Sequence, residues 1–186
     1  MSTRHQLSRR PKYASLIGML ALETVDLEIE LSLLFSALLS LHPSIGEVIY
    51  LTPRGDQSRI EMLRHAASII FAIHPSANPH SASSTQKRKY LKRIRDIAER
   101  AHKSIQNRHR AVHDEWFILR GEKRIKRGRV DIVDDEGKSI TLKQLKSEVR
   151  EMRLVIDEIT TLAKEFIEFP PKLPQRRLTK RPGKNR

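Results

Sequence analysis

The sequence predicts an all-α fold: a single-domain helical bundle of about four to five helices, with a small β-hairpin inserted before the last helix. Apolar residues recur every three or four positions over three long stretches, 13–41, 86–113 and 142–168, which is the period of a helix. Residues 56–73 repeat the pattern over a shorter length. The chain has 186 residues, 38% of them hydrophobic, and is therefore long enough to bury one sizeable core.

The first long helix is expected over residues 13–41. Its core stripe follows a helical spacing through Leu16, Leu20, Thr24, Leu27, Leu31, Leu34, Leu38 and Leu41. Val25, Ile29, Leu33 and Phe35 widen the stripe, which predicts that the second half is buried on more than one side. Four acids between positions 23 and 30 interrupt the apolar run, so we expect neither a membrane span nor an export signal here.

Shorter elements follow, bounded by residues that end helices. His42-Pro43 breaks the chain, 44–51 is expected as a two-turn helix, and 52–55 as a turn before the helix at 56–73. The composition of 75–85 predicts a loop. The last helix should begin after Thr141, which can form a capping box with Gln144, and should end before Pro170.

Between the last two long helices, the β-prone runs 116–119 and 130–133 predict a hairpin. The residues between these runs give the hairpin a basic tip, formed by Arg120, Lys123, Arg124, Lys126, Arg127 and Arg129.

The net charge of +14 is concentrated at the two ends of the chain. Residues 1–12 hold four basic residues and 170–186 hold seven, with no acid in either segment. We expect a disordered basic arm at 1–12, a helical bundle at 13–169 and a disordered basic tail at 170–186. The tails are either solvated or hold nucleic-acid phosphates without sequence preference. The absence of cysteine excludes disulfides and thiolate metal sites and is compatible with a cytoplasmic protein.

The helix at 86–113 carries the residues with the clearest chemical potential. Arg108 stands where its apolar stripe requires a hydrophobic residue. A guanidinium on that face needs a carboxylate, a phosphate or water, because burying it without a partner is costly. Glu23 or Glu30 of the first helix could balance it. His109 follows Arg108 directly, and His113 lies one turn after His109.

Two kinds of site fit this group. His102, His109 and His113 are spaced seven and four apart and could share a zinc ion, but the neighbouring cations disfavour a dication. The alternative uses arginine and histidine on a phosphodiester, where arginine stabilises the developing negative charge and histidine moves a proton. We favour the second reading, with no metal and no cofactor.

The segment Arg108-His109-Arg110-Ala111-Val112-His113 resembles the Arg, four to six residues, His motif of the HEPN superfamily. Two other pairs have a similar spacing, Arg59–His65 and Arg95–His102, but only Arg108 is on an apolar stripe near a helix end. Trp116 also matches a longer form of the motif, whereas His109 replaces its asparagine and Asp114 its glycine. A tyrosine that is adenylylated in some members has Glu115 at its place.

The resemblance implies a small helical domain acting as a metal-independent endoribonuclease of toxin–antitoxin or defence type, with Arg108 and His113 as catalytic residues and His109 in support. Glu30 is expected to support Arg108 by balancing its charge. It also implies a homodimer that forms a composite site, RNA as substrate, and a possible antitoxin or other regulatory protein as partner, without membrane association. Some family members have lost catalysis, so a dimeric interaction or nucleic-acid-binding protein is the alternative. Basic residues expected to contact RNA are Lys87, Arg88, Lys89, Lys92, Arg124, Lys126 and Arg127.

Overall fold

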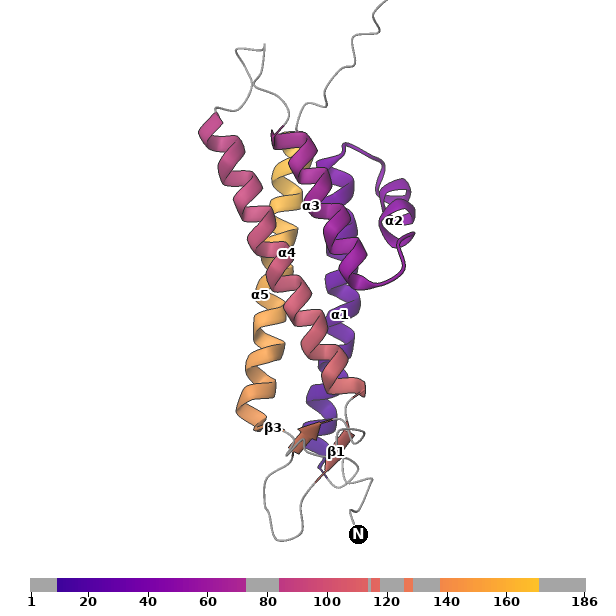
Figure 1. The fold of residues 1–186 in the computed structure, drawn as a ribbon, viewed down its shortest axis with the longest axis vertical. Coiled ribbons are helices and arrows are strands. Elements are labelled where there is room, and N and C mark those ends of the chain that lie inside the picture. The colour runs from indigo at the N-terminus through magenta and orange to yellow at the C-terminus, as the bar shows by residue number, and fades with distance from the viewer. Residues whose placement is uncertain (1–9, 73–83, 114, 118–125, 129–137, 171–186) are drawn as a thin grey trace, which may run out of the picture.

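A computed structural model of the chain describes residues 10–72, 84–113, 115–117, 126–128 and 138–170. The described part is an all-α bundle with three short strands at one end (Figure 1). Its helices are α1 (Pro11–Leu38), α2 (Pro43–Leu51), α3 (Asp56–Ala72), α4 (Ser84–His113) and α5 (Leu142–Glu168). All five lie within three residues of the ranges predicted from the sequence. In the described part of the chain, no helix combines the length and apolar character that crossing a membrane requires.

Three long helices, α1, α4 and α5, make up the length of the molecule. Side-chain contacts between α1 and α5 join residues about 130 positions apart, such as Arg153 to Glu23 and Thr160 to Glu30, so these two helices run parallel. Contacts between α4 and α5 run in the opposite sense along the chain, from Arg93 to Glu165 and from Arg100 to Glu151, so α4 is antiparallel to both. The shared core is lined by leucines of α1, by Ile94 to Ile105 of α4 and by the near-heptad stripe of α5.

The widened stripe predicted for α1 is only partly right. Phe35 is buried and Leu33 is half-buried, but Val25 is 55% exposed and Ile29 is 48% exposed. Both lie on the side of α1 that faces away from the core stripe. The helix therefore buries one face along its length and leaves a second apolar face in solvent.

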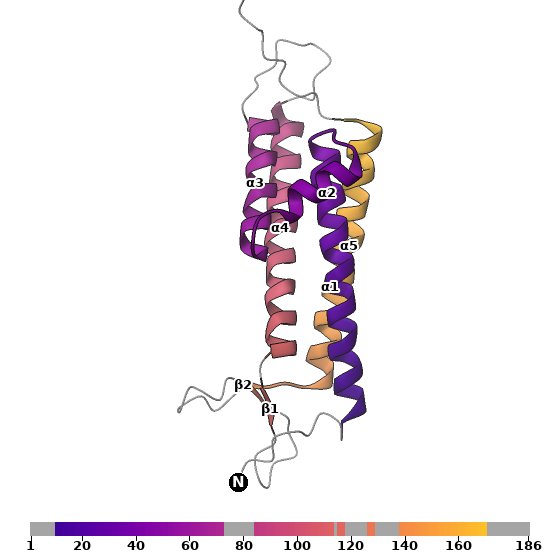
Figure 2. The same cartoon turned by 90° about the vertical axis from the view of Figure 1, so that its right-hand side faces the viewer.

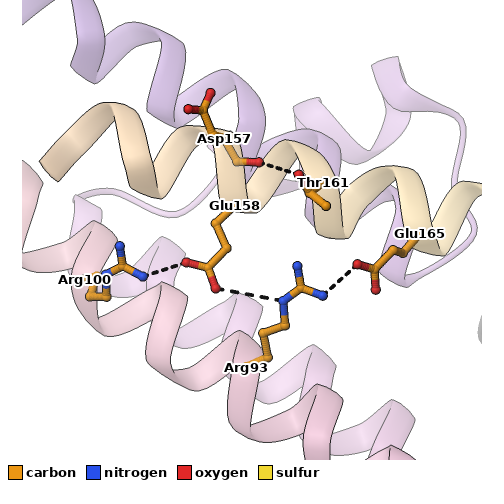
Figure 3. A network of polar contacts seen from close by, with 6 residues as sticks. All are labelled: Arg93, Arg100, Asp157, Glu158, Thr161 and Glu165. Atoms are coloured by element: carbon orange, nitrogen blue, oxygen red, sulfur yellow. Dashed lines mark hydrogen bonds and ion pairs between the residues drawn. The ribbon is translucent and has the colours of Figure 1, made fainter. Parts of the chain in front are cut away.

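An ion-pair network joins the middle of α4 to α5, and Figure 3 shows its contacts among Arg93, Arg100, Glu158 and Glu165. Arg93 lies 2.7 Å from Glu165 and 3.9 Å from Glu158, and Arg100 lies 2.6 Å from Glu158 and 3.0 Å from Glu151. The arginines are seven residues apart, and the glutamates are also spaced by seven. Matching spacing on two antiparallel helices places each cation near two carboxylates, which fixes how the helices face each other. We call these five residues the ladder.

The short helix α2 packs across the upper part of α1 (Figure 2). Gly46 is buried against Ser36, and the rings of Tyr50 and Phe35 have centroids 5.7 Å apart. Helix α3 returns toward α1 and α4, and Arg59 at its start pairs with Glu28 of α1 at 3.2 Å. Helix α5 begins with the predicted capping box, in which Thr141 and Gln144 bond each other's backbone amides.

The strands are β1 (Glu115–Phe117), β2 (Lys126–Gly128) and β3 (Lys138–Ser139), paired antiparallel in the order β1-β2-β3. The first overlaps the predicted run 116–119. The predicted partner run 130–133 lies outside the described residues, and β1 pairs with 126–128 instead. Lys126 and Arg127, expected at a hairpin tip, are thus strand residues, while Arg124 lies outside the described residues.

Candidate functional site

Arg108 lies on the core-facing stripe of α4, near the C-terminal end of the helix. Ala101, Ser104 and Ile105 before it and Ala111 after it are at most 5% exposed. Arg108 itself is half-buried, and its Nε is buried without a hydrogen-bond partner. An unsatisfied buried donor is costly, so this position retains a polar group that the fold does not use.

Comparison with the other arginines sharpens this observation. The described part of the chain has five half-buried arginines, and four of them pair with glutamate: Arg59, Arg64, Arg93 and Arg100. Burial lowers the pKa of Arg100, but its hydrogen bonds to Glu158 and Glu151 outweigh burial and raise it. Arg108 is the fifth, and no described carboxylate lies within ion-pair distance of it. Its guanidinium therefore lies next to the core without an ion-pair partner among the described residues.

The acids expected to balance Arg108 are engaged elsewhere. Glu23 lies 2.6 Å from Arg153 of α5, and Glu30 accepts a hydrogen bond from Thr160 of α5 at 2.8 Å. Both glutamates lie on the face of α1 that packs against α5, because positions seven residues apart fall on nearly the same side of a helix. The expected pairing with Arg108, and with it the supporting role of Glu30, is therefore not made within the described chain.

His109 and His113 form an adjacent pair of imidazoles at the end of α4. Both side chains are exposed, and their ring centroids are 4.4 Å apart with an angle of 46° between the planes. A spacing of four residues brings them together on one face. Imidazole can both take up and release a proton near neutral pH, so this pair has the chemistry of a general acid and base.

His102 lies two turns before His109 on the same face of α4. Its Nε2 lies 2.7 Å from Gln106 Nε2, and its Nδ1 is buried without a partner. Among the described residues, no group of three histidines and acids is arranged to hold a metal ion. The zinc alternative built on His102, His109 and His113 thus gains no support from this geometry.

The rest of the motif lies just beyond α4. Asp114 is outside the described residues. Trp116 is in β1, where its backbone pairs with Arg127 of β2. The sheet therefore begins two residues after His113 and ties the end of α4 to the start of α5.

Basic residues cover the outer side of α4. Arg88, Lys89 and Lys92 are exposed, as expected, while Lys87 is half-buried. Arg93, from the same basic run, turns toward α5 and belongs to the ladder. The exposed surface continues down the helix, so we define the basic track as Arg88, Lys89, Lys92, Arg95, Lys103 and Arg110. Two exposed acids, Asp96 and Glu99, lie among them.

The structure separates the start of this track from the motif. Arg88 precedes Arg108 by 20 positions, which is about 30 Å along a helix. Sequence reasoning named only the start of the track and missed Lys103 and Arg110, although their spacing from Lys92 already indicates one helix face. It also missed the ladder, for which the seven-residue spacing of Glu151, Glu158 and Glu165 was the available signal.

Comparison of the chain with protein-family models, with curated proteins and with solved structures found no match.

Proposed function

We propose that this protein is a metal-independent endoribonuclease, in which Arg108 binds the scissile phosphate and His113 transfers a proton during the reaction. The observation that carries the proposal is the half-buried Arg108, whose Nε is buried without a partner, near the same end of α4 as two adjacent imidazoles. Similarly buried arginines in the described chain have carboxylate partners, so a missing partner at this one position is best explained by an anionic ligand.

The chemistry follows from these groups. Cleavage by an RNA 2′-hydroxyl forms a bond from that oxygen to phosphorus and breaks the bond to the 5′-oxygen of the next nucleotide. A base takes the hydroxyl proton, and an acid gives a proton to the leaving oxygen. The products are a 2′,3′-cyclic phosphate and a free 5′-hydroxyl. Arg108 would stabilise the additional negative charge on the phosphoryl oxygens in the transition state.

Two imidazoles are needed for this scheme, one as base and one as acid. His109 and His113 of one chain could divide the roles, since their rings are in contact. The resemblance to HEPN ribonucleases favours the other arrangement, in which two copies of the chain contribute His113 and Arg108 to one composite site. The basic track supports RNA as the substrate, because cations along a helix can follow a phosphate backbone.

A non-catalytic RNA-binding protein is the second candidate. Arg110 and His113 occupy the last turn of α4. Basic side chains in that turn interact favourably with the negative end of the helix dipole, so both residues also have a structural explanation. In this case the basic track binds RNA and no bond is broken.

One assay separates the two candidates. Purified protein is incubated with a mixed-sequence RNA, with and without a chelator, and the RNA ends are analysed for cyclic phosphate. We expect chelator-resistant cleavage that falls at least about 100-fold in Arg108→Ala and in His113→Ala, because proton transfer alone contributes about 100- to 10,000-fold. A strand with 2′-deoxy sugars should bind but remain intact.

The chain supplies its own control pair. Arg95 and His102 have a similar spacing on the same helix, and Arg95 is exposed. His102→Ala should retain cleavage within a few-fold of wild type. Arg95→Ala, which removes one cation of the basic track, should weaken RNA binding but leave the cleavage rate at saturating RNA within a few-fold of wild type. An intact RNA that the wild-type protein still binds would establish the second candidate. Activity that disappears with chelator and returns with zinc or manganese would refute the metal-independent scheme.

A further inference from the structure

The outward face of α1 is apolar over the lower half of the helix. Leu22 is 70% exposed, Val25 55% and Ile29 48%. Ser15 and Gly18 precede them on the same line and are also exposed. We call these five residues the α1 seam. Asp26 is the one exposed charge between Ala14 and Ile29, so this face lacks the charges that normally cover a solvated helix.

The spacing of the α1 seam indicates what covers it. Its residues follow one another at intervals of three, four, three and four. Such alternation marks the line along which one helix packs against another at a shallow angle. Toward the C-terminus of α1, the same line continues through Ser32 and Ser36. Ser36 is buried against Gly46 of α2. The C-terminal part of this line is thus already covered by α2, whereas the α1 seam itself is exposed.

We propose that the α1 seam packs against the α1 seam of a second copy of this chain, with the two helices antiparallel. A two-fold interface must be complementary to itself. Centred between Leu22 and Val25, the antiparallel pairing sets Leu22 against Val25 of the second copy, and Gly18 against its Ile29. A small residue then faces a large one. A Cβ added at Gly18 would have no neighbour within 4 Å beyond the backbone of its own helix, which leaves room for the opposing isoleucine.

Charge and shape favour the antiparallel direction over the parallel one. In a parallel pair Gly18 would face its own copy and leave a gap. The two α2 helices, which cover the seam line near Ser36, would also meet at the same level. In the antiparallel pair, α2 of one copy approaches the start of α1 of the other. Glu47 of α2 is exposed, and Arg10 and Lys12 at the start of α1 are exposed, so opposite charges come together.

Helix α2 also supplies additional contact area. A stable interface buries about 800 Å² on each partner, more than a single helical seam of about 21 Å provides. Ile45, Val48, Ile49 and Leu51 of α2 are 41–69% exposed. The antiparallel pair places some of these aliphatic side chains against the second copy at both ends of the seam. Because α4 is antiparallel to α1, this pair sets the two helix ends that carry Arg108 and His113 at opposite ends of the dimer, so it is not the pairing that a composite ribonuclease site requires. The proposal does not depend on ribonuclease activity.

The first test measures mass. The full chain, freed of RNA by nuclease and high salt, should have twice its 21.6 kDa mass at micromolar concentration in light scattering and sedimentation. Val25→Arg should raise the dimer dissociation constant at least tenfold. The matched control is Leu154→Arg, since Leu154 is 50% exposed on α5, and this variant should leave the constant unchanged. Circular dichroism checks that both variants remain folded.

The second test determines whether the two α1 helices pair antiparallel. Because the chain has no cysteine, disulfides can form only between cysteines that are introduced. A mixture of Leu22→Cys and Val25→Cys chains should form a disulfide between the two variants, as should Gly18→Cys with Ile29→Cys. Leu22→Cys alone should cross-link poorly. Efficient cross-linking of Leu22→Cys to itself would overturn the antiparallel pairing. A monomeric wild type, or a dimer unaffected by Val25→Arg, would overturn the self-docking and leave the α1 seam to a different protein or to residues 171–186.

Discussion

Replacing Arg108 by methionine should make the protein more stable while it abolishes the proposed activity. Methionine keeps an unbranched, flexible side chain on the core-facing stripe but carries no buried donor. In the wild type, Nε of Arg108 is buried without a partner. The substitution therefore removes a polar group that folding desolvates and does not satisfy.

The size of the effect follows from that single atom. An unsatisfied buried polar group costs about 1–3 kcal/mol. Some packing of the arginine stem is lost with the change, so we expect a gain near the lower end, about 1 kcal/mol. For a chain of this length, 1 kcal/mol corresponds to a rise in melting temperature of about 2–4 °C.

Arg100→Met provides the opposite case on the same helix. Arg100 pairs with Glu151 and Glu158 at 3.0 and 2.6 Å. Partly exposed ion pairs contribute about 0.2–1 kcal/mol each, so this variant should lose about 1 kcal/mol and melt about 2–4 °C lower. Thermal unfolding followed by circular dichroism, at two protein concentrations to account for dimerisation, measures both shifts. If Arg108→Met melts as low as Arg100→Met, Arg108 has a structural partner and is not reserved for a phosphate.

Four further predictions concern the fold and the tail. Gly46→Ala should lower the free energy of unfolding by about 1–3 kcal/mol in a urea titration, because the added Cβ would overlap Ser36. Gly18→Ala, with open space around the added Cβ, should raise the unfolding free energy of the monomer by about 0.5–1 kcal/mol. Burial raises the pKa of Tyr50 above its ordinary value near 10. The unfolded state then ionises first, so stability should fall as pH rises above about 10, and less so in Tyr50→Phe. Deleting residues 171–186 should leave the melting temperature unchanged but reduce the salt slope of RNA binding, by about 0.7 for each lost phosphate contact.

Periodicity located the four longer helices of the described chain, because each carries an apolar stripe long enough to show its period, whereas the short α2 was located by the residues that end helices on either side of it. The start of α5 was predictable to the residue, since Thr141 and Gln144 form a local motif whose bonds do not depend on the rest of the fold. The position of Arg108 on a buried stripe was also visible, since neighbouring positions on a helix share a face.

Partners across helices were harder to predict. Glu23 and Glu30 were expected to meet Arg108, but they face α5, and the sequence does not encode which neighbour each side of α1 meets. Because the sequence does not show which sides of α1 have a neighbouring helix, Val25 and Ile29 were also expected to be buried. An apolar residue on a helix predicts that its side chain is buried. The sequence of one chain does not show whether the burying surface belongs to the same molecule or to a second one.

The ladder between α4 and α5 has a mechanical consequence for the far end of α4. A long helix in a bundle can slide along its axis or turn about it. Each arginine contacts two glutamates that are seven residues apart, about 10 Å along the helix, so sliding by one turn would break one of its two contacts. Turning would break them as well. The ladder therefore opposes a rotation of α4 that would carry Arg108 into solvent, although its arginines lie about two to four turns away from Arg108.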